Sequence, residues 1–235
     1  MAISPEKKLE QYYARTAHSY DDSQFHENDE HFKALMFLRG AIAERNYQSL
    51  LDVGCGTGRA LSYLKTAYPD LHTVGIEPVE ELRQQAFAKG FTATEVISGN
   101  GQALPFPDKS FDCVVAFGVL HHVEHPEKII AEIFRVAKKA VFLSDHNIYG
   151  WGSAPTRFSK QTARKLLGFQ ILKLLMTKGL GYHDTDYDGI YYPFSLFEHL
   201  PAIANGSKQM SLIATKGSPI HLYSQASHIA VFAET

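Results

Sequence analysis

The regular alternation of short apolar runs with amphipathic segments in the middle of this sequence sets the strongest limit on its fold. Five apolar runs have the length of buried strands, at 49–54, 72–77, 92–98, 111–118 and 139–145. Three of the intervening segments have the pattern of helices, at 59–68, 79–90 and 125–139. Strands that alternate with helices in this way form a parallel sheet through right-handed crossovers, with helices on both faces.

The last part of the chain predicts a different pairing. Residues 209–215 and 227–234 are two further strands, and the turn-rich link between them is too short for a helical crossover. These two strands should therefore pair antiparallel. We expect an α/β fold with a Rossmann-like, mostly parallel seven-stranded sheet, helices on both faces, a final antiparallel pair of strands and a helical cap.

The remaining segments add to this core rather than form a second domain. Residues 1–30 are polar and aromatic, with a short helix around 5–14, and we expect them to form an N-terminal cap segment. A further helix is predicted at 30–46. Residues 147–206 exceed a normal connection, which indicates a lid or acceptor-binding insertion. We expect residues 1–235 to form a single domain.

Composition and charge exclude several classes of protein. Apolar residues make up 45% and charged residues 20%, as in ordinary globular chains. The formal net charge of −2 argues against a general nucleic-acid binder. The N-terminus lacks an export signal, and no segment is apolar enough to span a bilayer. Because Cys55 and Cys113 lie in apolar runs, they are expected to be reduced core thiols of a cytoplasmic protein.

A glycine-rich loop follows the first predicted strand. In the segment Asp52-Val-Gly-Cys-Gly-Thr-Gly58, glycine at every second position lets the backbone turn tightly and approach a ligand closely. A dinucleotide fingerprint, G-x-G-x-x-G, would need its third glycine at the position of Arg59 or Leu61. The loop therefore fits a dinucleotide pyrophosphate poorly. Glu77 ends the second strand, where an acid can accept hydrogen bonds from both hydroxyls of a ribose.

This loop, Glu77 and the segment SGNGQALPFPDKSFDCVVAFGVLHHVEHPEKIIAEIFRV resemble the class I S-adenosylmethionine-dependent methyltransferases. The sequence is most similar to their type 11 subgroup, which acts on small molecules. The resemblance covers about residues 45–146, and the final antiparallel pair is typical of the same family. It implies S-adenosyl-L-methionine as the cofactor and methyl transfer as the reaction.

The resemblance also implies a role for each part of the cofactor site. Asp52 and the loop backbone would hold the methionine amino group, and Glu77 the ribose. The segment from Asn100 to Gln102 would line the adenine. An aromatic ring can stabilise the positive sulfur, and the candidates in the N-terminal segment are Tyr12, Tyr13 and Tyr20, although these rings could instead only pack on the sheet edge. The expected cofactor-binding residues are Tyr20, Asp52, Gly54, Cys55, Gly56, Gly58, Glu77, Pro78, Asn100, Gly101, Gln102, Phe117, Gly118 and Val119.

Titratable side chains follow the fourth and fifth strands. A hydroxyl acceptor loses its proton near the transition state, so a base helps the reaction. The expected cluster comprises His121, His122, His125, Asp145 and His146. His122 and His146 are the preferred bases, with Asp145 as a third catalytic candidate, although each histidine could instead serve only packing. Their spacing matches no metal-ligand signature, so no metal is expected.

The predicted lid carries a one-sided charge. Residues 157–178 contain six Lys or Arg and no acid, and their apolar residues suggest one helical stripe, formed by Ala163, Leu166, Leu167, Ile171, Leu174 and Leu175. Such a helix could be a docking helix with a solvated basic face. It could also be a lid that meets an anionic or lipid-linked acceptor or the surface of a membrane.

The most favoured function is methyl transfer from S-adenosyl-L-methionine to a small-molecule acceptor. O-methylation of a sugar or glycan intermediate, or of another specialised metabolite, is preferred. The alternatives are a catalytically silent module that binds S-adenosylmethionine or S-adenosylhomocysteine, and an NAD-dependent oxidoreductase. No nucleic-acid partner is expected, and the sequence leaves the oligomeric state open.

Overall fold

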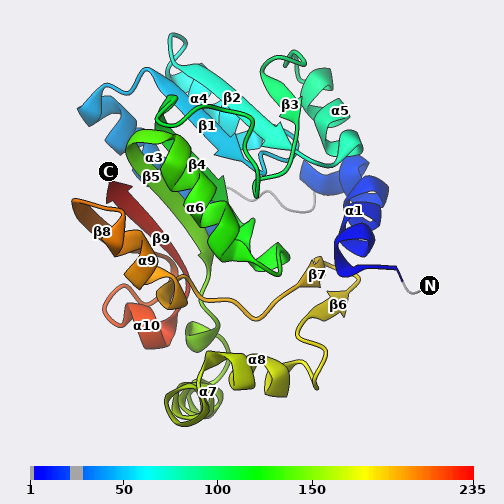
Figure 1. The fold of residues 1–235 in the computed structure, drawn as a ribbon, viewed down its shortest axis with the longest axis vertical. Coiled ribbons are helices and arrows are strands. Elements are labelled where there is room, and N and C mark those ends of the chain that lie inside the picture. The colour runs from blue at the N-terminus through cyan, green and yellow to red at the C-terminus, as the bar shows by residue number, and fades with distance from the viewer. Residues whose placement is uncertain (1–2, 22–28) are drawn as a thin grey trace.

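The computed structural model describes residues 3–21 and 29–235, and its centre is a seven-stranded sheet (Figure 1). The strand order is β3-β2-β1-β4-β5-β9-β8. Strands β1 to β5 pair in parallel, whereas β9 is antiparallel to both β5 and β8. The predicted fold class is confirmed. The strands are β1 (Ser49–Val53), β2 (His72–Glu77), β3 (Val96–Ser98), β4 (Phe111–Phe117), β5 (Ala137–His146), β8 (Gln209–Gly217) and β9 (Ala226–Glu234).

Helices cover both faces of this sheet, which explains why the strands are apolar throughout. Within β1, Leu50 and Leu51 belong to two different apolar clusters, because successive side chains point to opposite faces. One cluster includes Ile133 of α6 and Ile203 of α9, and the other includes Leu38 of α3. The helices around the sheet are α3 (Glu30–Arg45), α4 (Arg59–Ala67), α5 (Glu80–Ala88), α6 (Pro126–Val136), α9 (Leu200–Asn205) and α10 (Leu222–Gln225).

Two predicted boundaries are wrong. Strand β3 begins at Val96 rather than at residue 92, because residues 92–95 close a turn in which the Glu95 amide donates to the Thr92 carbonyl. Helix α6 ends at Val136 rather than at residue 139. The next residue already pairs with Phe111 of β4, so the pairing of β5 with the sheet overrides the helical pattern.

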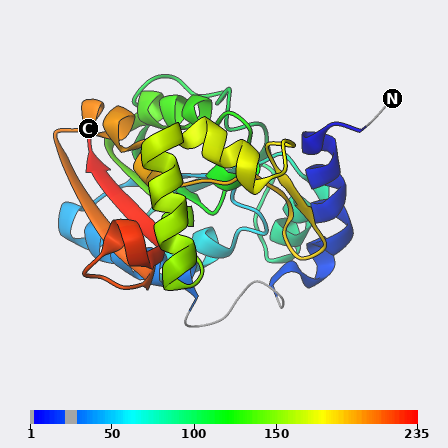
Figure 2. The same ribbon diagram turned by 90° about the horizontal axis from the view of Figure 1, so that it is seen from below.

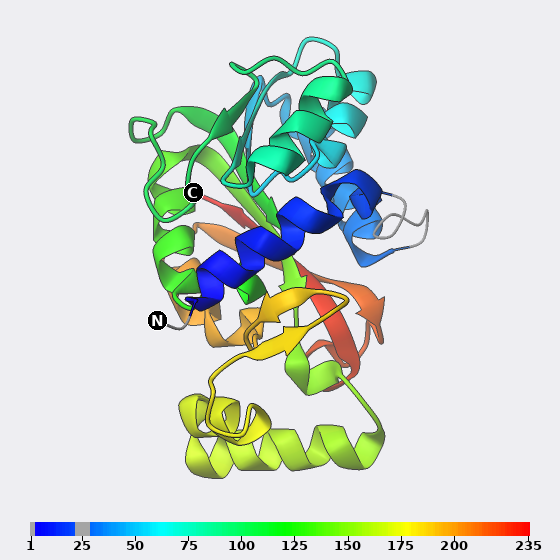
Figure 3. The same cartoon turned by 90° about the vertical axis from the view of Figure 1, so that its right-hand side faces the viewer.

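The N-terminal helix α1 (Pro5–Thr16) lies across the carboxyl-terminal end of the sheet (Figure 3). It is longer than the sequence predicts, and its first turn is capped by the Ser4 hydroxyl, which accepts from the Lys7 amide at 3.3 Å. The end of the expected cap segment, residues 22–28, lies outside the described residues. The Lys8 ammonium forms an ion pair with Asp184 of the predicted lid at 2.7 Å.

The expected lid consists of helices and a hairpin. Its elements are α7 (Ala154–Leu167), α8 (Phe169–Met176), β6 (His183–Thr185) and β7 (Gly189–Tyr191). Figure 2 shows that α8 turns steeply away from α7. The break is Gly168, whose φ of 84° lies in the left-handed region. In the part of the chain that the structure describes, no helix is both long and apolar enough to cross a membrane.

The single apolar stripe predicted over residues 157–178 is therefore wrong. The side chain that α8 buries is Leu172, which packs against Ile148 and Tyr149 at the base of the insertion. Because Gly168 changes the helix direction, most of the predicted stripe faces solvent instead: Leu166, Leu167, Ile171, Leu174 and Leu175.

Buried Asn147 anchors the insertion to the end of the sheet. Its side-chain amide donates to the carbonyls of Ala226 at 2.7 Å and Tyr223 at 2.9 Å. Its Oδ1 accepts from the Ser195 hydroxyl at 2.9 Å. These bonds hold the start of the insertion and its segment at Ser195 beside the carboxyl end of β5.

Two glycine substitutions should separate close packing from helix propensity. A Cβ at Gly150 would overlap the Ala226 carbonyl, so Gly150→Ala should lower the free energy of unfolding by about 1–3 kcal/mol. Gly40 lies within α3 with open space around it, so Gly40→Ala should raise this free energy by about 0.5–1 kcal/mol. Urea unfolding of both variants provides the measurement. Equal changes of the same sign would contradict the described packing of Gly150.

Candidate functional site

A cleft lies at the carboxyl ends of β1, β2 and β4. This edge is where open α/β sheets place their ligands. The cleft and a smaller adjoining pocket bring together the expected cofactor residues apart from Gly58, which stands at the start of α4. The residues that line them are Tyr20, Asp52, Gly54, Cys55, Gly56, Glu77, Pro78, Asn100, Gly101, Gln102, Phe117, Gly118 and Val119.

The glycine loop owes its shape to its sequence. Gly54 and Gly56 have φ of 74° and 55°, in the left-handed region that disfavours side chains. A Cβ at Gly54 would lie 2.5 Å from Cγ2 of Val119, whereas one at Gly56 would point into open space near the Tyr20 ring. The loop backbone therefore packs closely against the turn after β4 and leaves room for a ligand above Gly56.

Glu77 is held by backbone amides at the end of β2. Its Oε2 accepts from the Gly56 amide at 3.0 Å and its Oε1 from the Val79 amide at 2.9 Å. Burial raises the pKa of this carboxyl to about 7, although the two amides oppose the shift. Each carboxylate oxygen retains a lone pair, so the side chain can also accept from two vicinal hydroxyls in the cleft.

Asp52 has a buried carboxylate oxygen, Oδ1, that receives no hydrogen bond from the described residues. Burial raises the pKa of Asp52 to about 7. A buried carboxylate oxygen without a donor is costly, and an ammonium group would satisfy it. Together with Glu77, this residue fits the ammonium and the ribose of S-adenosylmethionine.

A second cavity adjoins the cleft. The two spaces share lining residues, namely Tyr13, Tyr20, Phe117, Gly118 and His122. A molecule in the second cavity would therefore lie next to a ligand in the cleft. Its other walls come from β5, β9, α3 and the hairpin, so it is built where the sheet, the N-terminal segment and the insertion meet.

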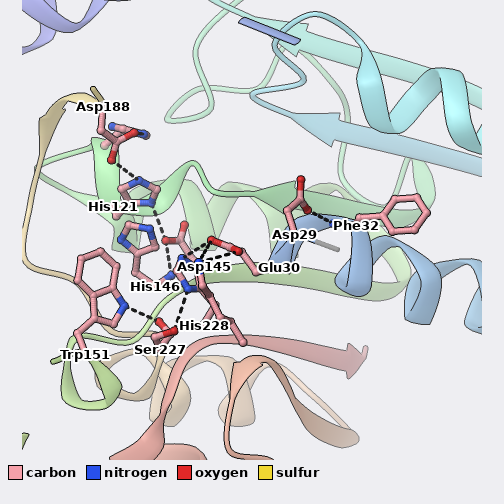
Figure 4. Close-up of polar contacts among 12 residues, drawn as sticks. Asp29, Glu30, Phe32, His121, Asp145, His146, Trp151, Asp188, Ser227 and His228 are labelled. Atoms are coloured by element: carbon pink, nitrogen blue, oxygen red, sulfur yellow. Dashed lines mark hydrogen bonds and ion pairs between the residues drawn. The ribbon is translucent and has the colours of Figure 1, made fainter. Parts of the chain in front are cut away.

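Asp145 organises the polar wall of this second cavity (Figure 4). Its buried carboxylate accepts from His121 Nδ1 at 2.7 Å, from the Leu120 amide at 2.8 Å and from the His146 amide at 2.6 Å. Burial alone would raise the pKa of Asp145, but the imidazolium and these donors hold it below the ordinary value. Burial also disfavours charge on His121, yet Asp145 and Asp188 raise the pKa of this imidazole to about 9.

His122 differs from its neighbour in sequence. Burial and the adjacent His121 charge lower its pKa to about 4, so its imidazole is neutral. Its Nδ1 donates to the Ile190 carbonyl at 2.7 Å, which leaves Nε2 without a proton. The Tyr13 hydroxyl donates to this Nε2 at 2.8 Å.

The other predicted histidines have different environments. His146 stacks on the His121 ring with centroids 3.8 Å apart, and burial with the neighbouring histidines holds its pKa well below the ordinary value. The expectation that His125 joins the cluster is wrong, because this half-exposed side chain contacts Glu127 at the start of α6.

Several cavity residues were not singled out from the sequence. His228 of β9 is brought beside His146 by antiparallel pairing, and Asp188 comes from the turn between β6 and β7. The Asp188-Gly189 pair is a hairpin signal that could have predicted this turn from the sequence, but not its place beside the cavity. Trp151 and His31 complete the group, and they come from segments for which the sequence suggests no common location.

The basic side chains of α7 do not line this cavity. Lys160 donates to the carbonyls of Ile148 and Trp151, and Arg164 forms an ion pair with Glu198 at 3.0 Å. The cations at the cavity are Arg59 and Lys216, and Lys216 pairs with Glu30 at 3.1 Å. The parts of the insertion that reach the cavity are Trp151 and the turn of the hairpin.

Comparisons with known proteins agree with this arrangement. Residues 51–144 match the family model described as methyltransferase domain, of type 11. Over 110 residues the chain is 36% identical to an uncharacterized 37.1 kDa protein in transposon Tn4556 of Streptomyces fradiae, covering 46% of this chain and 31% of that protein. It is also 32% identical over 133 residues to Probable tRNA methyltransferase 9B of Bos taurus. This match covers 56% of this chain and 28% of that protein. The chain thus spans about a third of the length of these relatives.

Solved structures show the same fold over nearly the whole chain. A Thermotoga maritima protein described as an S-adenosylmethionine-dependent methyltransferase, possible histamine N-methyltransferase, superposes with a TM-score of 0.62 and 18% identity. The match covers 95% of this chain and 98% of that protein. The family model thus matches residues 51–144 as a methyltransferase domain, in the part of the chain where the motifs suggested one, and the solved structure shows the same fold.

Removal of the Glu77 carboxylate should weaken cofactor binding. Glu77→Ala removes the carboxylate that is expected to accept from the ribose hydroxyls, so the affinity for S-adenosylmethionine should fall by about 1.5–3 kcal/mol. Isothermal titration calorimetry measures this loss. Glu81→Ala, at an exposed position of α5 that does not line the cleft, is the matched control, and an unchanged affinity in Glu77→Ala would reject the ribose assignment.

Cofactor affinity should also depend on pH. Asp52 and Glu77 have pKa values raised to about 7, so the cofactor-free protein is partly protonated at both in neutral solution. A cationic cofactor favours the ionised carboxylates, so its affinity should rise by about tenfold or more between about pH 5.5 and 7.5 and then level off. Asp52→Asn should flatten part of this rise. An affinity that falls over the same range would contradict the prediction.

Proposed function

We propose that this chain transfers a methyl group from S-adenosyl-L-methionine to a hydroxyl of a small molecule. The observation that carries the proposal is the pair of adjoining spaces that share Phe117, Gly118 and His122. The cleft presents Glu77, with Asp52 in its smaller adjoining pocket, and the other space presents a cluster of histidines. A donor and an acceptor bound in the two spaces would meet at their common wall.

In this reaction the chain mainly positions the methyl donor relative to the acceptor. S-adenosylmethionine supplies a methyl group that is already activated on a positively charged sulfur. Asp52 and Glu77 fix the orientation of the donor through its ammonium and ribose. Tyr13 and Tyr20 lie edge to face with ring centroids 5.9 Å apart at the junction of the two spaces. Their rings exclude water there and favour a nearby positive charge.

The histidine cluster would prepare the acceptor. His122 is the residue of the predicted catalytic set whose unprotonated nitrogen lies at the junction. An acceptor hydroxyl that replaces the Tyr13 hydroxyl at this nitrogen is held beside the donor. Asp145 and His146 act as positioning residues, because Asp145 orients His121 and His146 stacks on its ring.

The lining of the second cavity favours a polar, uncharged acceptor such as a sugar derivative or another hydroxylated metabolite. Polar side chains such as Trp151, Asp188 and His228 surround it, with charges of both signs. The basic helix predicted to meet an anionic or lipid-linked acceptor lies elsewhere, so it gives no support to that choice. Residues 147–206 would close over the acceptor through their hairpin.

The experiment first compares equilibrium binding of S-adenosylmethionine and NAD to the purified chain. Release of S-adenosylhomocysteine is then followed with a panel of hydroxylated small molecules, amines and a transfer RNA. Tight binding of S-adenosylmethionine with turnover on a hydroxylated compound supports the proposal. Preferential NAD binding, turnover only on transfer RNA, or cofactor binding without any turnover would each reject it.

His122→Gln should separate acceptor activation from cofactor binding. Turnover should fall by about 10²–10⁴-fold, because glutamine lacks an unprotonated ring nitrogen, while the affinity for S-adenosylmethionine should remain within about threefold. Steady-state kinetics and calorimetry give the two quantities. His125→Gln, at the half-exposed histidine outside the cavity, is the matched control. Wild-type turnover in His122→Gln would leave this residue with a packing role alone.

A further inference from the structure

Asp188 lies near the Nε2 atoms of two imidazoles at an unusual spacing, and Figure 4 shows it beside one of them, His121. Its carboxylate oxygens are 3.7 Å from His121 Nε2 and 3.6 Å from His122 Nε2. Both separations exceed a normal hydrogen bond of about 2.7–3.2 Å. They match the ligand spacing of about 3.4 Å that a tetrahedral ion with bonds of about 2.1 Å requires.

The opposite nitrogens of both rings are fixed by acceptors. His121 Nδ1 donates to Asp145 at 2.7 Å, and His122 Nδ1 donates to the Ile190 carbonyl at 2.7 Å. Each ring therefore turns its Nε2 toward Asp188. A carboxylate or backbone carbonyl behind each ligating imidazole is the outer-shell arrangement that orients histidines in metal sites.

We propose that His121, His122 and Asp188 bind a divalent first-row metal ion at the wall of the second cavity. Their three ligand atoms lie within 4.8 Å of one another. Two imidazoles and one carboxylate suit Zn²⁺, Co²⁺, Fe²⁺ or Mn²⁺ rather than Mg²⁺ or Ca²⁺, which prefer oxygen ligands. Because all three residues also line the second cavity, the remaining coordination positions face the space assigned to the acceptor.

A second group, formed by His121, Asp145 and His146, also has ligand atoms within 4.8 Å. The carboxylate of this group already has its hydrogen-bond donors, because Asp145 accepts from His121 and from two backbone amides. All three of its residues are buried, whereas Asp188 is a quarter exposed. The site that opens to the cavity is therefore the one with Asp188.

The ion gives the cluster a chemical role that rests on the proposed methyl transfer. An acceptor hydroxyl that coordinates the ion has a lowered pKa and releases its proton to water. A lone pair of the resulting oxyanion forms the new C–O bond to the methyl carbon. The C–S bond breaks at the same time, and its electron pair stays on sulfur, so the products are a methyl ether and neutral S-adenosylhomocysteine. With the ion bound, His122 Nε2 is a ligand and no longer receives the acceptor hydroxyl directly, so no side chain has to accept the proton.

Metal binding is tested with the full chain in the absence of any acceptor. Zn²⁺ is titrated calorimetrically into chelator-treated protein, and Co²⁺ is followed by its visible absorption, which reports coordination by nitrogen and oxygen. We expect one ion per chain, displacement of Co²⁺ by Zn²⁺, and loss of the Tyr13 hydrogen bond to His122. Absence of a stoichiometric ion in both titrations would overturn the proposal.

Three variants of the proposed ligands and one control variant test which residues bind the ion. Asp188→Asn, His121→Gln and His122→Gln should each weaken Zn²⁺ binding by about 10–100-fold or more. His125→Gln controls for adventitious binding at an accessible histidine and should change nothing. Binding of S-adenosylmethionine by each variant shows that it is folded. An ion that binds equally well to Asp188→Asn would belong to another group and would overturn the assignment.

A chelator then separates this inference from the proposed function. If the metal site exists and serves the reaction, chelator treatment should abolish turnover but leave the affinity for S-adenosylmethionine unchanged, and Zn²⁺ or Mn²⁺ should restore turnover. Full turnover of metal-free protein would reject the role of the ion while the methyltransferase function stands. Failure to bind S-adenosylmethionine would instead reject the proposed function itself.

Discussion

The buried carboxylate of Asp145 is the interaction on which the polar end of this molecule depends. A carboxylate removed from water is stable only when it receives strong donors, and here it receives one imidazole and two backbone amides. Those donors fix the turn after β4, the end of β5 and the ring of His121 relative to one another. The His121 carbonyl in turn accepts from the Tyr192 amide, so the same arrangement reaches the start of the final segment of the insertion.

The topology of the sheet explains why so many titratable groups meet at one edge. Parallel β4 and β5 end side by side, so His121, His122 and His146 are close neighbours. Strand β9 runs in the opposite direction and starts where β5 ends, which adds His228 next to His146. The insertion leaves the sheet at this same point and returns over it. Residues distant in sequence thus form one cavity because strand direction places their ends together.

The sheet and the cofactor cleft follow from local sequence, whereas the second cavity does not. Apolar runs and the glycines at 54 and 56 carry their own structural signal, because burial and backbone conformation act over a few residues. The location of Asp188 depends on how a hairpin packs on α1, which no local pattern encodes. The sequence contains Gly168 between the two helices, but it does not show that the chain changes direction there. His121 and His122 are adjacent in sequence, but Asp188 lies far along the chain. No short spacing motif could therefore predict that the three side chains meet.

The hairpin of β6 and β7 has a consequence for the His122 ring at the cavity. It supplies the Ile190 carbonyl behind His122 and also Asp188 in front of it. Because one short hairpin carries both partners, any displacement of it would change the orientation and the electrostatic surroundings of the His122 ring at the same time.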